Sequence, residues 1–103
     1  MNLMSYLPPR RTVLIESRSR QDAIRELMAV ACPDLGGIAA CEAVEAVETR
    51  ERDISTRIAP GIALPHARIP GLGGFMLALG YSREGIVWDA AGDTPVRLVL
   101  LLL

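Results

Sequence analysis

The chain has 103 residues, which is enough for one domain and too few for two of ordinary size. Half of the residues are hydrophobic and 22% are charged, which is typical of a globular core and excludes a disordered or fibrous chain. The 11 basic residues, all arginine, nearly balance the 12 acidic ones. The net charge of -1 therefore argues against a nucleic-acid partner, which needs a basic excess.

The cysteines and the apolar segments indicate a cytoplasmic protein with no membrane insertion. Cys32 and Cys41 could form at most one disulfide, and the segment before Pro8 does not resemble a secretory signal. The longest apolar run, residues 98–103, is far shorter than the ~20 residues that a membrane-spanning helix needs. Two cysteines and one histidine also cannot form an ordinary structural zinc site, so no metal site is expected.

The first third of the chain predicts a short strand followed by a helix. Residues 12–16 (TVLIE) are mostly apolar and β-branched, which favours an extended segment. Ser19 followed three residues later by Asp22 resembles a capping box, and apolar residues then recur at helical spacing. This pattern predicts a helix over residues 21–31, which Pro33 ends.

Residues 38–52 predict a second helix with an acidic face. Small apolar residues on one side alternate with four glutamates at a spacing of three, Glu42, Glu45, Glu48 and Glu51. The simplest interpretation of this acidic stripe is a face in contact with solvent. Arg50 and Arg52 fall in the last turn of this helix, where the helix dipole favours cations.

The second half of the chain alternates apolar segments with loops. Loops or turns are predicted at residues 54–60, 67–74 and 82–94. Apolar segments predict strands at residues 61–64, 75–81 and 96–103. Two early helices and several short strands indicate one domain with an α/β fold, a layered sandwich with a mixed β-sheet flanked by helices.

His66 is the only histidine, and it directly follows a predicted strand that ends at Pro65. A neutral imidazole is a nucleophile near pH 7 and can carry a covalent group on a ring nitrogen, most simply a phosphoryl group. Arg50 and Arg68 are candidates to hold that group, because guanidinium binds phosphate in a bidentate manner, and Thr56 could add a hydroxyl. The alternative is an ordinary loop or packing histidine, and residue chemistry alone does not decide between the two.

Apolar residues flank His66 on both sides in the sequence: Ile58, Ile62, Ile69, Leu72 and Met76. If they are exposed, they form an apolar rim on which a partner protein could dock. Burial in the core is an equally open interpretation.

Residues 50–68, RERDISTRIAPGIALPHAR, resemble the signature of the IIA domains of the fructose, mannitol and nitrogen-regulatory class of the bacterial phosphoenolpyruvate-dependent sugar phosphotransferase system. The similarity extends through residues 19–27, 84–89 and 93–96, so it covers nearly the whole chain. It implies the α/β sandwich of that family, with residues 1–103 as a single IIA-like domain. It also implies a phosphoryl carrier that requires neither a metal nor an organic cofactor.

The resemblance also assigns roles to residues. His66 falls on the phosphoacceptor of the family, and Arg50 falls on the arginine that helps to hold the phosphate. A histidine phosphocarrier, HPr or its nitrogen-branch counterpart, would phosphorylate His66, and a IIB component would then receive the group in sugar transport. Alternatively, the chain would be a nitrogen-type or transporter-linked regulatory module that controls a kinase or transporter by its phosphorylation state.

The sequence departs from the pattern of the family in two places. Arg57 stands where the family usually has glycine, and it could assist phosphate binding or point into solvent. Members generally continue past residues 96–103 with further helices and a second histidine, so we expect a domain that is truncated at its C-terminus. We then expect an uncovered last strand, an uncovered apolar sheet face and self-association of the chain. A domain that keeps the fold without phosphorylation is a third interpretation.

Overall fold

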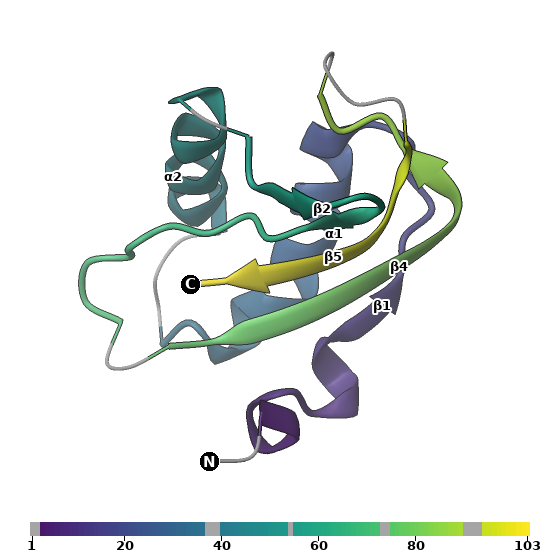
Figure 1. Ribbon diagram of the computed structural model, residues 1–103. Helices are drawn as coiled ribbons and strands as arrows, with labels where there is room; N and C mark the ends of the chain where they lie inside the picture. The colour runs from purple at the N-terminus through teal and green to yellow at the C-terminus, as the bar shows by residue number, and fades with distance from the viewer. Residues whose placement is uncertain (1–2, 37–39, 54, 73–74, 90–93) are drawn as a thin grey trace.

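The chain folds into a single five-stranded sheet with two α-helices in the part of the chain that the computed structural model describes, residues 3–36, 40–53, 55–72, 75–89 and 94–103 (Figure 1). The helical elements are three short 3-10 helices (Leu3–Tyr6, Pro9–Arg11 and Cys32–Asp34), α1 (Arg20–Ala31) and α2 (Ala40–Asp53). The strands are β1 (Thr12–Leu14), β2 (Arg57–Ala59), β3 (Ile62–Ala63), β4 (Leu77–Ile86) and β5 (Val96–Leu102).

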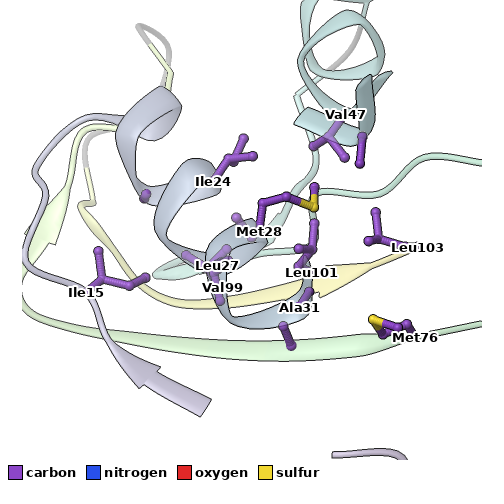
Figure 2. Close-up of a cluster of buried hydrophobic side chains, with 14 of the residues drawn as sticks. Ile15, Ile24, Leu27, Met28, Ala31, Val47, Met76, Val99, Leu101 and Leu103 are labelled. Atoms are coloured by element: carbon purple, nitrogen blue, oxygen red, sulfur yellow. The ribbon is translucent and has the colours of Figure 1, made fainter. Parts of the chain in front are cut away.

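The sheet is mixed, as the sequence predicts. Its strand order is β1-β4-β5-β3-β2. The β1–β4 and β3–β5 pairs are parallel, whereas the β4–β5 and β2–β3 pairs are antiparallel. α1 packs against β4, β1 and α2, and both α-helices contribute to the core on one face of the sheet (Figure 2). The expected layered α/β sandwich is therefore confirmed.

α1 begins and ends where its sequence signals predict, within one residue. The hydroxyl of Ser19 accepts a hydrogen bond from the backbone N–H of Asp22 at 3.2 Å, which satisfies one of the unpaired donors at the helix N-terminus. The apolar stripe that contains Ile24, Leu27 and Met28 is buried. The predicted helix over residues 21–31 is therefore confirmed.

α2 is also confirmed, but the interpretation of its acidic stripe as a solvent face is wrong for two of the four glutamates. Residues 38 and 39 of the predicted helix lie outside the described residues, and Ala43 and Val47 are fully buried. Glu42 and Glu45 are exposed, whereas Glu48 and Glu51 are only 5% and 4% exposed. Thr56 donates to both carboxylate oxygens of Glu51, and Arg20 pairs with one oxygen of Glu48, whose other oxygen has no hydrogen-bond partner among the described residues. Helical spacing alone cannot reveal such partners.

β4 is longer than predicted. The polar residues 82–84, which indicated a turn, instead continue the strand through a register irregularity between Tyr81 and Ile86. Ser82 is buried, and its hydroxyl accepts a hydrogen bond from the backbone N–H of Gly85 at 3.0 Å. The polar side chain is thus satisfied by the irregular backbone itself, so the strand can extend to Ile86.

β5 lies between β4 and β3, so both of its edges are paired and the expectation of an uncovered last strand is wrong. The expected uncovered face exists in part. Leu14 of β1 pairs with Tyr81 of β4 on the side opposite the helices, and these side chains are 39% and 48% exposed. Self-association of the chain through this face stays a prediction.

The core lies between the sheet and the two α-helices (Figure 2). Met28 of α1 and Val47 of α2 point toward Leu101 and Leu103 at the end of the chain (Figure 2). Gly80 of β4 allows Ile15 and Leu27 to pack closely against the sheet, because a Cβ at that position would overlap the side chain of Ile15 and crowd that of Leu27.

The substitution Gly80→Ala is therefore expected to destabilise the fold by about 1–3 kcal/mol, which is the usual cost of an extra methyl group in a packed core. Urea unfolding followed by far-UV circular dichroism measures this change. Tyr81→Phe, at the next position on the opposite and open face, is the matched control and should change stability by no more than about 0.5 kcal/mol. A Gly80→Ala protein as stable as the Tyr81→Phe protein would contradict this packing.

Glu26 of α1 fixes the chain as it leaves β1. Its carboxylate accepts hydrogen bonds from the backbone N–H groups of Glu16 at 3.1 Å and Ser17 at 3.0 Å. Partial burial acts to raise the pKa of this carboxyl, but the hydrogen bonds from the Ser17 side chain and from both backbone groups outweigh it. The pKa of Glu26 therefore lies below its ordinary value, because the charged form is the better acceptor.

A group whose pKa is lowered by folding stabilises the fold above its unfolded pKa and loses this effect as the pH falls through its folded pKa. At pH 7 we expect Glu26→Gln to be less stable than the unsubstituted chain, by less than about 1 kcal/mol because the site is solvent-accessible. Urea unfolding between pH 7 and pH 3 should show the difference shrinking below the ordinary Glu pKa of about 4.3. A difference that stays constant or grows with acidification would contradict the assignment.

Candidate phosphohistidine site

The segment before the histidine forms a tight hairpin, which corrects the predicted loop at residues 54–60. β2 and β3 pair with Ala59 opposite Ile62, so Pro60 and Gly61 form the turn. Gly61 has a φ of +82°, and proline followed by such a glycine is the signature of a type II turn. The sequence Ala59-Pro60-Gly61-Ile62 already contained this signal. Ile54, the first residue of the predicted loop, lies outside the described residues.

The hairpin is joined to the centre of the sheet through Gly61. Its carbonyl accepts hydrogen bonds from the backbone N–H groups of Arg97 at 2.9 Å and Leu98 at 3.1 Å. β3 then runs parallel to β5 toward the histidine. The position of the residues that follow β3 is therefore set by the central strand.

The backbone around His66 is hydrogen-bonded to the end of β5. The carbonyl of Pro65 accepts a hydrogen bond from the N–H of Leu102 at 3.0 Å, and the N–H of Ala67 donates to the carbonyl of Leu102 at 3.2 Å. His66 and Leu102 thus form a parallel β-bridge. The histidine follows a predicted strand, as expected, but it is held as a one-residue extension of the sheet and not on a free loop.

The imidazole ring of His66 is oriented by a backbone carbonyl two residues earlier. Nδ1 lies 2.9 Å from the carbonyl oxygen of Leu64. A carbonyl oxygen can only accept a hydrogen bond, so Nδ1 carries the proton and donates it. In the neutral ring the lone pair therefore resides on Nε2, which is the nitrogen that can act as a nucleophile.

His66 is half-buried and lies at an open depression with a volume of about 610 Å³. Arg68 supplies a cation to the same depression, and apolar side chains form much of the remainder. The other lining residues are Ala67, Ile69, Pro70, Leu72, Phe75, Leu102 and Leu103. The end of β5 and the start of the segment leading into β4 are thus part of the site, although no sequence motif singled out Leu102 or Phe75.

The predicted apolar rim is divided between the surface and the core. Ile58 of β2 is 65% exposed, and Leu72 lines the depression. Ile69 and Met76 are buried and belong to the core. Phe75 supplies exposed apolar surface that the prediction missed, and its ring lies 4.5 Å from that of Tyr6 between centroids.

Thr56 is linked to His66 through Leu64. The carbonyl of Thr56 accepts a hydrogen bond from the backbone N–H of Leu64 at 2.9 Å. Its hydroxyl, which was a candidate phosphate donor, instead donates to the buried carboxylate of Glu51. Thr56 is therefore a buried residue, 5% exposed, that contacts Leu64 and Glu51.

The three candidate arginines occupy different environments. Arg68 is exposed and lies at the depression with His66. Arg50 is half-buried in the last turn of α2, as predicted, and is not among the residues that line the depression. Arg57 forms an ion pair with Asp89 at 3.5 Å, and Ser55 donates to the same carboxylate oxygen at 2.6 Å. Arg57 is therefore half-buried and ion-paired, and it is not among the residues that line the depression.

Two further observations concern metal binding and membrane-spanning helices. Among the described residues, no three His, Cys, Asp or Glu side chains are grouped so that they could hold a metal ion. Within the same residues, neither α-helix has the length and apolar character that crossing a membrane requires.

Residues 6–103 match the family model described as phosphoenolpyruvate-dependent sugar phosphotransferase system, EIIA 2. The chain belongs to this family. It is 32% identical over 89 residues to the fructose-specific EIIABC component of Bacillus subtilis strain 168, a match that covers 85% of this chain and 14% of that protein. It is 34% identical over 61 residues to the fructose-specific EIIA component of Haloferax volcanii, covering 59% of this chain and 40% of that protein.

Solved structures of IIA proteins have the same fold. The nitrogen regulatory protein IIA-Ntr from Neisseria meningitidis superposes with a TM-score of 0.87 at 28% identity, over 96% of this chain and 68% of that one. The IIA mannitol structure from Escherichia coli superposes with a TM-score of 0.76 at 21% identity, over 92% of this chain and 69% of that one. The chain thus spans about two thirds of these structures and a smaller share of the fructose-specific relatives.

Proposed function

We propose that the chain is a phosphoryl carrier in which Nε2 of His66 accepts the phosphoryl group. The observation that carries this proposal is the hydrogen bond from Nδ1 to the Leu64 carbonyl, because it leaves the lone pair of the neutral ring on Nε2. The bonds that Pro65 and Ala67 make with Leu102 support it, since a nucleophile held in place needs little reorganisation before transfer. The membership of the family is consistent with this chemistry.

Transfer from a phosphohistidine on a donor protein needs no cofactor. The lone pair of Nε2 forms a bond to phosphorus while the P–N bond of the donor breaks, and the electron pair of that bond returns to the donor ring. The proton on Nδ1 stays in place. The Leu64 carbonyl then stabilises the positive charge that the phosphorylated ring of His66 acquires.

We assign the binding of the phosphoryl dianion to Arg68 and Arg50. Arg68 lies at the depression with His66, and its exposed guanidinium can reach a group attached to the ring. Arg50 is assigned from the residue pattern of the family. Arg57 and Thr56 would first have to release Asp89 and Glu51, so we do not give them a direct contact with phosphate.

The partners we propose are proteins, and the transfer takes place in the cytoplasm. The donor is a histidine phosphocarrier, HPr or its nitrogen-branch equivalent, and a IIB component receives the group. The apolar lining of the depression beside His66 supports docking of a protein surface. Among similar folds is a complex of the mannitol IIA and phosphorylated IIB enzymes of Escherichia coli, with a TM-score of 0.76.

The second candidate is a nitrogen-type or transporter-linked module that regulates a kinase or transporter by its phosphorylation state. The similarity to IIA-Ntr of Neisseria meningitidis favours this candidate. The two fructose-specific relatives favour sugar transport. Both functions use the same chemistry at His66 and differ in the protein that responds.

Intact-mass analysis at neutral to alkaline pH tests the proposal after incubation with phosphoenolpyruvate, enzyme I and the histidine phosphocarrier. We expect one acid-labile phosphoryl adduct on the chain and none on a His66→Ala variant of equal circular dichroism spectrum. Adding a fructose-type IIB domain should remove the adduct if the chain serves transport, whereas retention of the adduct would favour regulation. A folded chain without an adduct, or an adduct on His66→Ala, would contradict the proposed acceptor.

A further inference from the structure

Glu51 and Thr56 are buried polar residues with no direct part in the transfer step proposed above. They are 4% and 5% exposed. The carboxylate of Glu51 accepts two hydrogen bonds from Thr56, one from the hydroxyl and one from the backbone N–H at 3.2 Å. A buried carboxylate needs such donors, so this contact fixes Thr56 to the last turn of α2.

Thr56 is also bonded to the residue that orients His66. Its carbonyl accepts a hydrogen bond from the N–H of Leu64 at 2.9 Å, and the carbonyl of Leu64 accepts one from Nδ1 of His66 at 2.9 Å. Leu64 precedes Pro65, and a residue before proline is restricted mainly to extended conformations. Because Leu64 has few other conformations available, a shift of its backbone would move its carbonyl away from the His66 ring.

We propose that Glu51 is a positioning residue for His66. By holding Thr56, its carboxylate keeps the Leu64 carbonyl where it accepts the proton of Nδ1, and the lone pair stays on Nε2. The consequence for phosphoryl transfer rests on the proposed function, whereas the consequence for the protonated nitrogen of the free ring does not. The hydrogen bonds from β5 to Gly61 do not involve Glu51, so we expect the sheet to form without this contact.

Glu48 provides a matched control on the same helix. It is 5% exposed, close to the value for Glu51, but its carboxylate pairs with Arg20 of α1 at 3.3 Å. Its replacement removes a buried carboxylate without touching Thr56 or Leu64. A purely structural role of buried glutamates in α2 predicts the same result for both positions, whereas positioning of His66 predicts different results.

The experiment measures the tautomer of the His66 ring from its two ¹⁵N chemical shifts, at a pH high enough for the ring to be neutral. Because the chain has one histidine, the signals need no further assignment. The phosphorylation rate is measured in parallel against the concentration of phosphorylated histidine phosphocarrier. The variants are Glu51→Ala, Glu51→Gln, Thr56→Val, Thr56→Ser and Glu48→Ala.

We expect Glu51→Ala and Thr56→Val to lower the fraction of rings protonated on Nδ1. They should also reduce the maximal transfer rate about tenfold, within the loss of up to about 10²-fold that a misplaced reacting group causes, with an unchanged KM for the donor. Thr56→Ser keeps the hydroxyl and should retain the original values. Glu51→Gln keeps an oxygen that can accept from the Thr56 N–H and an amide that can donate to the Thr56 hydroxyl oxygen. It should therefore retain most of the original tautomer fraction and transfer rate. Glu48→Ala should lower only stability.

Thr56→Val keeps the shape of the side chain, so it tests the proposal even if Glu51→Ala does not fold. A folded Thr56→Val protein with the original tautomer and rate would overturn the positioning role. Equal changes in tautomer for Glu48→Ala and Glu51→Ala would also overturn it. A tautomer shift in Thr56→Val, in a chain that accepts no phosphoryl group, would support positioning while contradicting the proposed function.

Discussion

The pairing of His66 with the end of β5 is the constraint on which the site depends. The two backbone hydrogen bonds to Leu102 fix where the residue lies, and the Leu64 carbonyl fixes how its ring is turned. Neither contact uses a side chain other than the imidazole itself. A short sheet therefore supplies what the proposed phosphoryl carrier would need, which is one histidine in a fixed position with its Nδ1 proton held by a carbonyl.

The rest of the fold supports that pairing from two directions. From the core, Val99, Leu101 and Leu103 of the last segment pack beneath α1 and α2, so the end of β5 is held firmly (Figure 2). From the other side, the turn at Gly61 joins the β2–β3 hairpin to Arg97 and Leu98. The strand and the hairpin are thus fixed to each other before either reaches the histidine.

Much of this architecture could be predicted from local sequence signals. The capping residue Ser19 predicts the start of α1, and the patterns of apolar residues predict both α-helices and the apolar segments that contain β3, β5 and the first half of β4. The residues around His66 resemble the family motif, and the match over residues 6–103 establishes the family. These predictions succeed because each depends on neighbouring residues in the chain.

Features that depend on distant partners could not be predicted in this way. Glu48 and Glu51 share the spacing of the exposed glutamates Glu42 and Glu45, and their polar partners, Arg20 and Thr56, are distant from them or lie beyond the end of the helix. Arg57 could have bound phosphate or pointed to solvent, and Asp89, more than 30 residues later in the sequence, decides where it lies. The role of Leu102 in placing His66 likewise follows from β5 lying at the centre of the sheet.

The most direct test of this account is the nitrogen that carries the phosphoryl group. Long-range ¹H–¹⁵N correlation spectra of the phosphorylated chain, labelled on its single histidine, distinguish the two ring nitrogens by their chemical shifts. The hydrogen bond from Nδ1 to the Leu64 carbonyl predicts phosphorus on Nε2 and a proton retained on Nδ1. Phosphorus on Nδ1 would require that bond to break, and it would contradict the account.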